Sequence, residues 1–361
     1  MDNGRLASIP TGLVNDNALA SAVRNTYLSF LERRDALGLS NPGTFENINR
    51  EVARDVLLTN FMFTGLRAEW NKPISNSPIF QLSHQLSMGA QGMSPYTFSA
   101  LYGSSKVFLQ GTMENDGSLV ARSNYRWNDS LITKTNAQIQ SSQSMLSIEN
   151  DFSGRDFTAS LKAMNPSIIE GGVKGIFIAS YLQSVTPSLA LGIEAVWQRV
   201  AMNSSPEALL SYGARYKGLD WIASLQMQTE GPQGSAISSS YWRRLTDKVS
   251  VGTDLSLQFA PGLSGQGGLM GGSLQKEGSA TAGAKYEFRA STFRAQVDSK
   301  GRLSCLLEKT ILPAVRVTFA GEMDHLKQQA KVGVGVSVEA MSEDLMEQAE
   351  KGGVQAPAVP F

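Results

Sequence analysis

The segment Ala330–Ala340 alternates strictly between apolar and polar or small residues. A helix cannot produce this division, whereas a β-strand places successive side chains on opposite faces of a sheet. The polar positions hold two charges and two glycines, which favours a wet, roomy surface on that side. One parity holds Val332, Val334, Val336 and Val338, and the other holds Lys331, Gly333, Gly335, Ser337 and Glu339.

The same two-residue period repeats along most of the chain, between turn residues and without intervening helices. Short connections favour antiparallel neighbours joined by hairpins. The faces are less clear at 177–182 and 237–244. Cutting at the turn signals predicts roughly nineteen strands, at about 61–70, 78–88, 96–103, 106–113, 118–126, 131–140, 144–152, 156–164, 173–184, 188–200, 207–217, 220–230, 234–244, 248–259, 278–288, 291–298, 302–309, 313–322 and 331–339.

Such a series is compatible with a propeller, stacked sandwiches or one large barrel. A propeller requires a repeat of about 40–45 residues, and the chain has none. The apolar parity is unbroken by charge in strand after strand, and aromatic residues gather near predicted strand ends, as in the girdles of lipid-facing barrels. We therefore predict an all-β membrane protein, a transmembrane β-barrel with a water-filled pore; the alternative is a soluble β-rich binding protein. The aromatic residues are Trp70, Tyr125, Trp127, Trp197, Trp221, Phe259 and Phe288.

Charge and composition exclude several classes of function. The 361 residues carry 32 Lys and Arg against 32 Asp and Glu, so bulk charge gives no reason to expect nucleic acid as a partner. No apolar run approaches the roughly 18 residues of a membrane helix, but strands cross a bilayer with about 9–11 residues each. The N-terminus shows no secretory signal, and the lone Cys305 has no disulfide partner, which fits a reducing compartment.

The regions flanking the strands differ from them in period. We expect an N-terminal extension over 1–59 with two helices, at Asn17–Leu37 and about Thr44–Leu58, the barrel over 60–340, and an acidic tail over 341–361. The glycine-rich segment 260–277 is expected to be a long loop. One side of the second helix carries Phe45, Ile48, Val52 and Val56.

No catalytic, cofactor or metal site is predicted. Two histidines and one cysteine do not supply an ordinary zinc site, and the metalloprotease, serine-hydrolase, nucleotide-loop and dinucleotide motifs are absent. His325 is interpreted as part of a polar turn, and His84, between Leu82 and Leu86, as a packed or interfacial side chain.

Two stretches carry a family resemblance. The run Gly321–His325 followed by Ala330–Val336, and the run Asn41–Glu46 leading into Arg50 and Glu51, resemble the central channel subunit of the mitochondrial outer-membrane protein translocase in its fungal form. The likeness covers about residues 40–340. The last predicted strand also matches the sorting signal of mitochondrial barrels, which consists of a polar residue, a glycine and two apolar residues with one residue between them. In this chain they are Lys331, Gly333, Val336 and Val338.

The resemblance implies a nineteen-stranded barrel whose first and last strands pair in parallel, with the helix at about 44–58 inside the pore. It also implies an integral protein of the mitochondrial outer membrane, with both termini in the intermembrane space. Unfolded precursor proteins would cross the pore without cofactor or hydrolysis. The implied partners are small single-helix subunits, presequence receptors, membrane lipids and a second copy of the chain in a dimer or higher oligomer.

Pore-facing acids are expected, on this resemblance, to contact basic presequences. They are Glu69, Asp220, Asp254, Glu287, Asp298, Glu308 and Glu322. Pore-facing bases are no fewer and include Arg67, Arg122, Arg126, Lys134 and Lys162, so ion selectivity stays open. We expect these cation–anion pairs in the last strands: Lys285/Glu287, Arg294/Asp298, Arg302/Glu308, Arg316/Glu322 and Lys331/Glu339.

The alternative within the superfamily is a metabolite pore of the mitochondrial anion-channel family. Against it stand the long N-terminal region with two predicted helices and the neutral charge balance, where an anion channel favours excess base.

Overall fold

A computed structural model describes residues 29, 34, 37–59, 61–90, 93–141, 144–169, 172–199, 205–231, 234–260, 275–312 and 314–340. The predicted tail over 341–361 and most of the predicted helix Asn17–Leu37 and of the predicted loop over 260–277 lie outside these residues. No helix among the described residues is long and apolar enough to cross a membrane.

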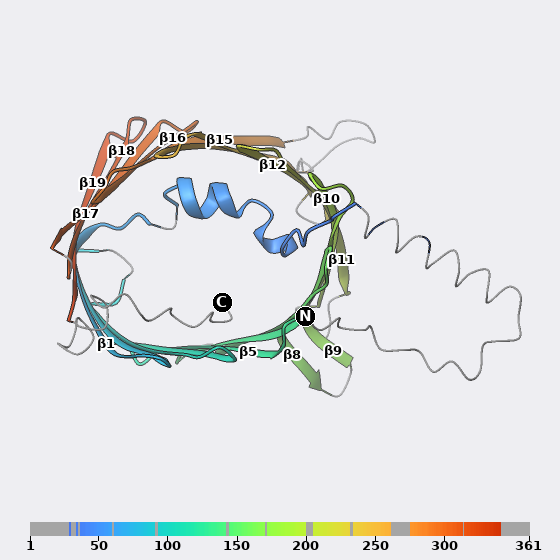
Figure 1. Ribbon diagram of the computed structural model, residues 1–361, viewed down its shortest axis with the longest axis horizontal. Coiled ribbons are helices and arrows are strands. Elements are labelled where there is room, and N and C mark those ends of the chain that lie inside the picture. The colour runs from blue at the N-terminus through green and yellow to red at the C-terminus, as the bar shows by residue number, and fades with distance from the viewer. Residues whose placement is uncertain are drawn as a thin grey trace, which may run out of the picture.

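Nineteen strands form one sheet that closes on itself as a barrel (Figure 1). They are β1 Gly65–Asn76, β2 Ile79–Met88, β3 Tyr96–Gly103, β4 Val107–Glu114, β5 Leu119–Asn128, β6 Leu131–Ile139, β7 Ser144–Ser153, β8 Phe157–Ile169, β9 Gly172–Ser184, β10 Leu189–Arg199, β11 Glu207–Lys217, β12 Trp221–Gly231, β13 Gly234–Thr246, β14 Val249–Ala260, β15 Gln275–Glu287, β16 Ser291–Asp298, β17 Arg302–Leu312, β18 Val315–Asp324 and β19 Gln329–Glu339. The strand number and the barrel are therefore confirmed for the part of the chain that is described.

The barrel closes where β1 meets β19. These two strands pair in parallel, with Gly65 opposite Gly333 and Ala68 opposite Val336. Every other neighbouring pair is antiparallel, as hairpin connections require. Since strand direction alternates around the wall, an odd number of strands forces the first and the last to run the same way.

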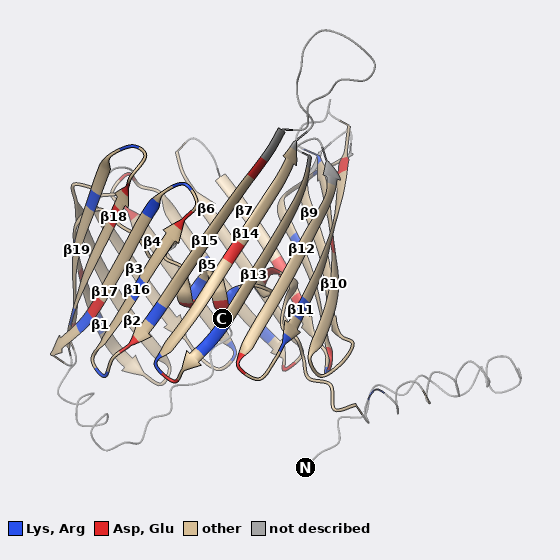
Figure 2. Cartoon of the chain, turned by 90° about the horizontal axis from the view of Figure 1, so that it is seen from above, with Lys and Arg blue, Asp and Glu red and all other residues tan. Residues whose placement is uncertain are grey.

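The two ends of the barrel differ. At one end the connections are short, such as 77–78 between β1 and β2 and 185–188 between β9 and β10. At the other end their length varies, from 170–171 between β8 and β9 to 261–274 between β14 and β15. We call these the short-turn end and the long-loop end. The backbone N–H of Ala340, just beyond β19, donates to the carbonyl of Asn71 at the short-turn end. Asn41, near the start of the segment that enters the lumen, donates to the Gly154 carbonyl in a turn of the same end. Both ends of the described chain therefore leave the barrel on the same side, at the bottom of Figure 2.

The outer wall is apolar and exposed. Val332 is 68% exposed and Leu66 58%, and both lie on the face opposite the lumen. An apolar surface that surrounds a whole molecule is unfavourable in water, and the strand lengths suit a bilayer. Figure 2 shows long uncharged stretches along the strands. The valines of β19 therefore face lipid, as predicted.

Aromatic rings cluster on this outer face beside the short turns. Trp221 stacks on Tyr216 at 4.9 Å between ring centroids, and Tyr125 contacts Trp127 at 4.8 Å. Tyr286 lies 4.2 Å from Phe288. Amphipathic rings at one level of a barrel are typical of the boundary between lipid and water.

The lumen holds the segment 40–63, the blue helical ribbon inside the ring of Figure 1. The predicted helix Thr44–Leu58 is not continuous: a 3-10 turn, η1 Phe45–Asn47, is followed by a π-helical stretch, η2 Glu51–Val56. The apolar side chains are spaced by three, then by four and four. In a 3-10 turn, residues three apart lie on the same side, which aligns Phe45 with Ile48. In the wider π-helical turns, residues four apart lie on nearly the same side, which aligns Val52 and Val56 with them. The change of pitch therefore turns all four side chains towards the same part of the barrel wall.

Strand prediction was accurate to within a residue or two at most boundaries, and 96–103, 207–217 and 291–298 match in full. The first strand is the clearest error, because it begins at Gly65 and not near 61. Phe61, Met62 and Phe63 instead pack inside the barrel with Leu58.

Candidate functional site: the lumen and its docked segment

Two glycines on neighbouring strands form a shallow dent for the ring of Phe45. Gly192 on β10 lies opposite Gly213 on β11. A Cβ at Gly192 would lie 2.9 Å from Phe45 Cδ2, so any larger residue there would collide with the ring. Phe45 is 3% exposed and packs with Ile48, and these two belong to a buried cluster with Leu182 and Ala190. This dent could not be predicted from the sequence, because register decides which glycines become neighbours.

A second pair of glycines repeats the arrangement farther along the segment. Gly252 on β14 lies opposite Gly283 on β15. A Cβ on Gly252 would lie 3.3 Å from Val52 Cγ1, and one on Gly283 would lie 3.2 Å from Val56 Cγ1. Val52 is 3% exposed and Val56 is fully buried. The four apolar residues predicted on one helix side therefore all face this wall.

The glycines of the final strand also receive an aromatic ring. A Cβ on Gly335 would lie 3.1 Å from Phe63 Cζ, and one on Gly333 would approach the Phe63 carbonyl oxygen. The expectation of a wet, roomy surface is wrong at these two positions. Phe63 covers them because the chain must pass along β19 before it turns into β1 at Gly65.

The end of the lumenal segment is held by apolar and polar contacts together. Leu58 is fully buried against Leu306, and its backbone N–H donates to Gln296 Oε1 at 2.7 Å. The guanidinium of Arg294 lies over the ring of Phe61, 4.6 Å from its centroid, where a cation–π contact is favourable. Arg294 also donates to the Asp55 carbonyl at 3.2 Å.

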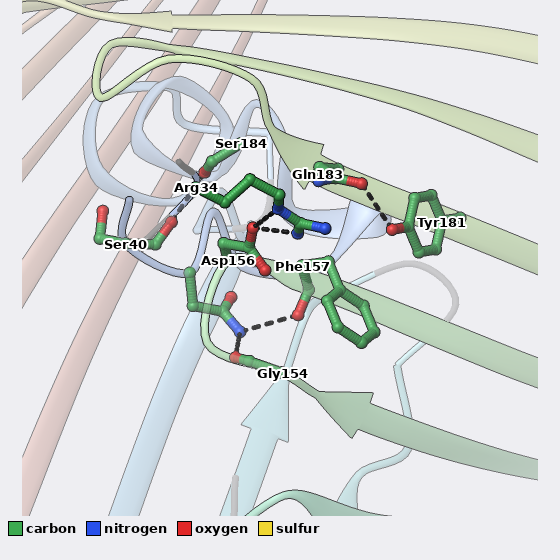
Figure 3. A network of polar contacts seen from close by, with 9 residues as sticks. Arg34, Ser40, Gly154, Asp156, Phe157, Tyr181, Gln183 and Ser184 are labelled. Atoms are coloured by element: carbon green, nitrogen blue, oxygen red, sulfur yellow. Dashed lines mark hydrogen bonds and ion pairs between the residues drawn. The ribbon is translucent and has the colours of Figure 1, made fainter. Parts of the chain in front are cut away.

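The start of the segment is tied to the short-turn end of β7, β8 and β9 (Figure 3). Asn41 Nδ2 donates to the carbonyls of Gly154 at 2.8 Å and Phe157 at 3.1 Å. Ser184 donates to the Ser40 carbonyl at 2.7 Å, and Arg34 Nε donates to Asp156 at 2.8 Å. These bonds join the start of the segment to the β7–β8 turn and to the end of β9.

A further anchor lies midway along the segment. Arg215 on β11 donates to the Pro42 carbonyl at 2.9 Å and forms an ion pair with Glu51 of η2. Both side chains are largely buried. A buried ion pair of this kind fixes a position and orientation more than it adds stability, so Arg215 sets where η2 lies on the wall.

The seven acids predicted to face the pore all lie on the lumenal parity, but they do not form one cluster. Asp298 and Glu322 lie towards the long-loop end, Glu69 and Asp254 near the middle, and Asp220, Glu287 and Glu308 towards the short-turn end. Their local roles also differ. Asp298 accepts backbone and hydroxyl hydrogen bonds of its own turn, from Lys300 at 3.4 Å and Ser299 at 3.3 Å.

The ion pairs of the last strands run mostly across strands. Lys285 pairs with Glu287 at 2.5 Å, as expected. Arg294 pairs with Glu308 at 3.3 Å rather than with Asp298. Lys331 lies 4.0 Å from Glu322, its register neighbour, rather than beside Glu339. The pairs expected for Arg302 and Arg316 do not form within 4.0 Å among the described residues.

Three further acids of the seven predicted to face the pore have at most one ion pair each among the described residues. Glu69 lies 3.5 Å from Arg67 and accepts a bond from Asn71 at 3.2 Å. Asp220 pairs with Arg244 at 3.2 Å on an exposed turn. Asp254 forms no ion pair with a described residue.

A denser network of charged residues lies on β6, β7 and β8, across the lumen from the last strands, and was not predicted. Lys134 on β6 lies 3.1 Å from Glu149 and 2.6 Å from Asp151, both on β7. Lys162 on β8 lies 3.5 Å from Glu149 and 3.4 Å from Glu46 of the lumenal segment. The parity of 144–152 places Glu149 and Asp151 on one face and could have identified them.

The histidines and the cysteine do not form a site. His84 lies on the outer face, 5.4 Å from the Trp70 ring and 2.7 Å from the Tyr96 hydroxyl, so it is a packed side chain, one of the two roles expected for it. His325 lies in the turn between β18 and β19. Cys305 is an exposed free thiol. No group of three His, Cys, Asp or Glu among the described residues is placed to hold a metal ion.

Comparison with known proteins extends these observations. The eukaryotic porin family matches residues 41–333. The chain is 52% identical over 353 residues to the mitochondrial import receptor subunit tom40 of Neurospora crassa, covering 98% of each chain. It is 42% identical to TOM40 of Saccharomyces cerevisiae, over 90% of this chain and 85% of that one. Among solved structures, a mutant Rh. blastica porin covers 67% of this chain and 90% of its own, with 11% identity and a TM-score of 0.40.

Proposed function

From the premise that this chain belongs to the eukaryotic porin family, among its Tom40 members, we propose how its lumen passes precursor proteins. The chain is the protein-conducting channel of the mitochondrial outer membrane and carries unfolded precursors through its pore, without a catalytic step. The observation that carries this proposal is the closed barrel, whose lumen keeps recesses of about 490 and 290 Å³ besides the space taken by the docked segment. The metabolite-pore alternative has less support, since relatives at 52% and 42% identity are import subunits.

Acidic side chains along the pore serve as successive contacts for basic presequences. Glu69, Asp254 and Glu287 lie at different depths on lumenal faces, so a moving cation always has another carboxylate ahead of it. Charged side chains that line a narrow channel focus the field and raise the local concentration of the opposite charge. The apolar face of an amphipathic presequence can meet Phe61 and Met62, which are only partly buried beside the cluster of Leu58.

The orientation and the partners are part of the same proposal. The barrel end that both ends of the described chain share faces the intermembrane space. Single-helix small subunits, presequence receptors and a second copy of the chain pack against the apolar outer wall. The motif Lys331, Gly333, Val336 and Val338 serves as the sorting signal of the barrel. Epitope tags at both termini test the orientation: protease should reach them only after the outer membrane is ruptured.

Conductance in planar bilayers tests the transport proposal. A basic presequence peptide should interrupt the current through the full chain, and the double variant Asp254→Asn/Glu287→Gln should shorten the interruptions several-fold. Asp247→Asn is the control, because Asp247 is an exposed residue of the turn between β13 and β14, outside the barrel wall, and should change nothing. If the peptide leaves the conductance of the wild type unchanged when added from either side, the transport proposal is wrong. If the peptide interrupts the current of the double variant for as long as that of the wild type, the assignment of these acids is wrong.

A further inference from the structure

A polar recess of about 490 Å³ lies between the lumenal segment and the wall formed by β5 to β8. Five cations line it: Arg50 and Arg54 of the segment, Arg122 on β5, Lys134 on β6 and Lys162 on β8. Only two acids line it, Glu46 and Glu149. We call this space the basic recess. Its volume is in the range of small-molecule sites.

The lysines and acids of the basic recess already neutralise one another. Glu149 lies 3.1 Å from Lys134 and 3.5 Å from Lys162, and Glu46 lies 3.4 Å from Lys162. Asp151 adds a second carboxylate to Lys134 at 2.6 Å. Little positive charge therefore remains on the lysine side of the recess.

The three arginines are not neutralised in this way. Among the described residues, no carboxylate lies within 4.0 Å of Arg50, Arg54 or Arg122. Arg122 contacts the face of the Phe108 ring, 5.7 Å from its centroid, which holds the guanidinium in place and leaves its N–H groups to other acceptors. Glu51, next to Arg50 in the sequence, is paired with Arg215.

The placement of these arginines depends on docking. The glycine pairs hold one side of the segment against β10 to β15, and the opposite side then faces the basic recess. Arg50 and Arg54 are four residues apart, a spacing that puts both on the same side of a helix. Two chain regions far apart in sequence thus bring three uncompensated guanidinium groups to one cavity.

We propose that the basic recess binds a small, multiply charged anion of the phosphate class. A guanidinium offers a planar fork of N–H donors that matches the oxygens of a phosphate group, and three such forks suit an anion with several charges. A chloride ion engages one fork at most, whereas a diphosphate or triphosphate group can reach all three.

The bound anion would have two physical effects. It would add negative charge beside the path of basic presequences and so shift the pore towards cations. It would also link Arg50 and Arg54 to Arg122, and thereby tie the lumenal segment to β5 on the side away from the glycine pairs. This inference goes beyond the proposed function, because binding can be measured without any transport.

Titration calorimetry of the refolded full chain in detergent micelles tests the proposal, with inorganic pyrophosphate as the probe. Arg122→Gln and the double variant Arg50→Gln/Arg54→Gln should each weaken binding by about tenfold or more, as expected for a lost charge-assisted hydrogen bond. Arg122→Lys, which keeps the charge without the fork, should fall between. Arg126→Gln is the matched control, because Arg126 lies on the same face of β5 outside the recess, and it should bind as the wild type does.

Three results would overturn the proposal: no pyrophosphate binding by the wild type, unchanged binding in Arg122→Gln, or an equal loss in Arg126→Gln. An acidic peptide that binds where pyrophosphate does not would assign the recess to polypeptide instead and would also overturn it. A nucleoside triphosphate compared with pyrophosphate separates the sources of the phosphate: equal affinity indicates that the phosphate chain alone is recognised, and tighter nucleotide binding indicates that the nucleoside adds contacts. Circular dichroism confirms that each variant retains its strands.

Discussion

Phe45 is one of the buried anchors of the lumenal segment, and Phe45→Ala should weaken its docking. Only 3% of Phe45 is exposed, and its ring fills the dent over Gly192 and Gly213. Truncation of a buried phenylalanine costs about 3–5 kcal/mol. Water of the pore can enter the vacated space, so we expect the lower end, about 3 kcal/mol. With a factor of ten for each 1.4 kcal/mol, the undocked population should rise on the order of 100-fold.

Hydrogen–deuterium exchange read by mass spectrometry measures this release directly. The backbone amides of residues 45–57 should exchange on the order of 100-fold faster in Phe45→Ala, while those of β2 to β7 keep their rates. Phe288→Ala is the matched control, because Phe288 is 53% exposed on the outer face and touches no part of the segment. Phe45→Leu keeps most of the volume and should show a smaller increase.

The reasoning fails if Phe45→Ala leaves exchange in 45–57 within about threefold of the wild-type rate, since that corresponds to less than about 1 kcal/mol. It also fails if the strand amides accelerate equally, because the segment and the wall would then open as one unit rather than separately.

Three other variants test the same geometry. Gly213→Ala places a Cβ 2.5 Å from Phe45 Cε2 and should accelerate exchange in the segment, with a cost of about 1–3 kcal/mol; Gly111→Ala, which meets nothing within 4 Å, should not. Arg215→Met should expose Glu51 and the N-terminal part of η2 to faster exchange, and unchanged rates would show that the ion pair does not position the helix. Val336→Asp places a charge in the lipid-facing row of β19 and should lower the fraction of chains that resist carbonate extraction after import into mitochondria, whereas Ser337→Asn, which faces the pore, should insert normally; equal insertion of both would contradict the assignment of faces.

The architecture was accessible from local patterns, whereas the family was indicated by the resemblance of a few short runs of residues. A strand records its two environments in alternate residues, so both faces of β14 and β19 could be read without knowing any neighbour. Turn residues marked most strand boundaries for the same reason, since they act within a few positions of themselves. The prediction failed at 61–64, where apolar residues before Gly65 continue the apparent pattern but belong to the lumenal segment.

Contacts that depend on register could not be read in this way. The registers of two hairpins bring Gly192 beside Gly213 and Gly252 beside Gly283, and these glycines become dents only because Phe45 and Val56 of the lumenal segment dock on them. The pairing of Arg294 with Glu308 has the same origin.

The sequence by itself therefore determined which side of each strand meets lipid and which meets the pore, because that division is written in neighbouring residues. The tertiary structure alone decided where the lumenal segment docks, how its helix changes pitch and which charges pair. These features depend on the register between neighbouring strands and on contacts of the lumenal segment with strands far from it in the chain, neither of which is recorded in the alternation of a single strand.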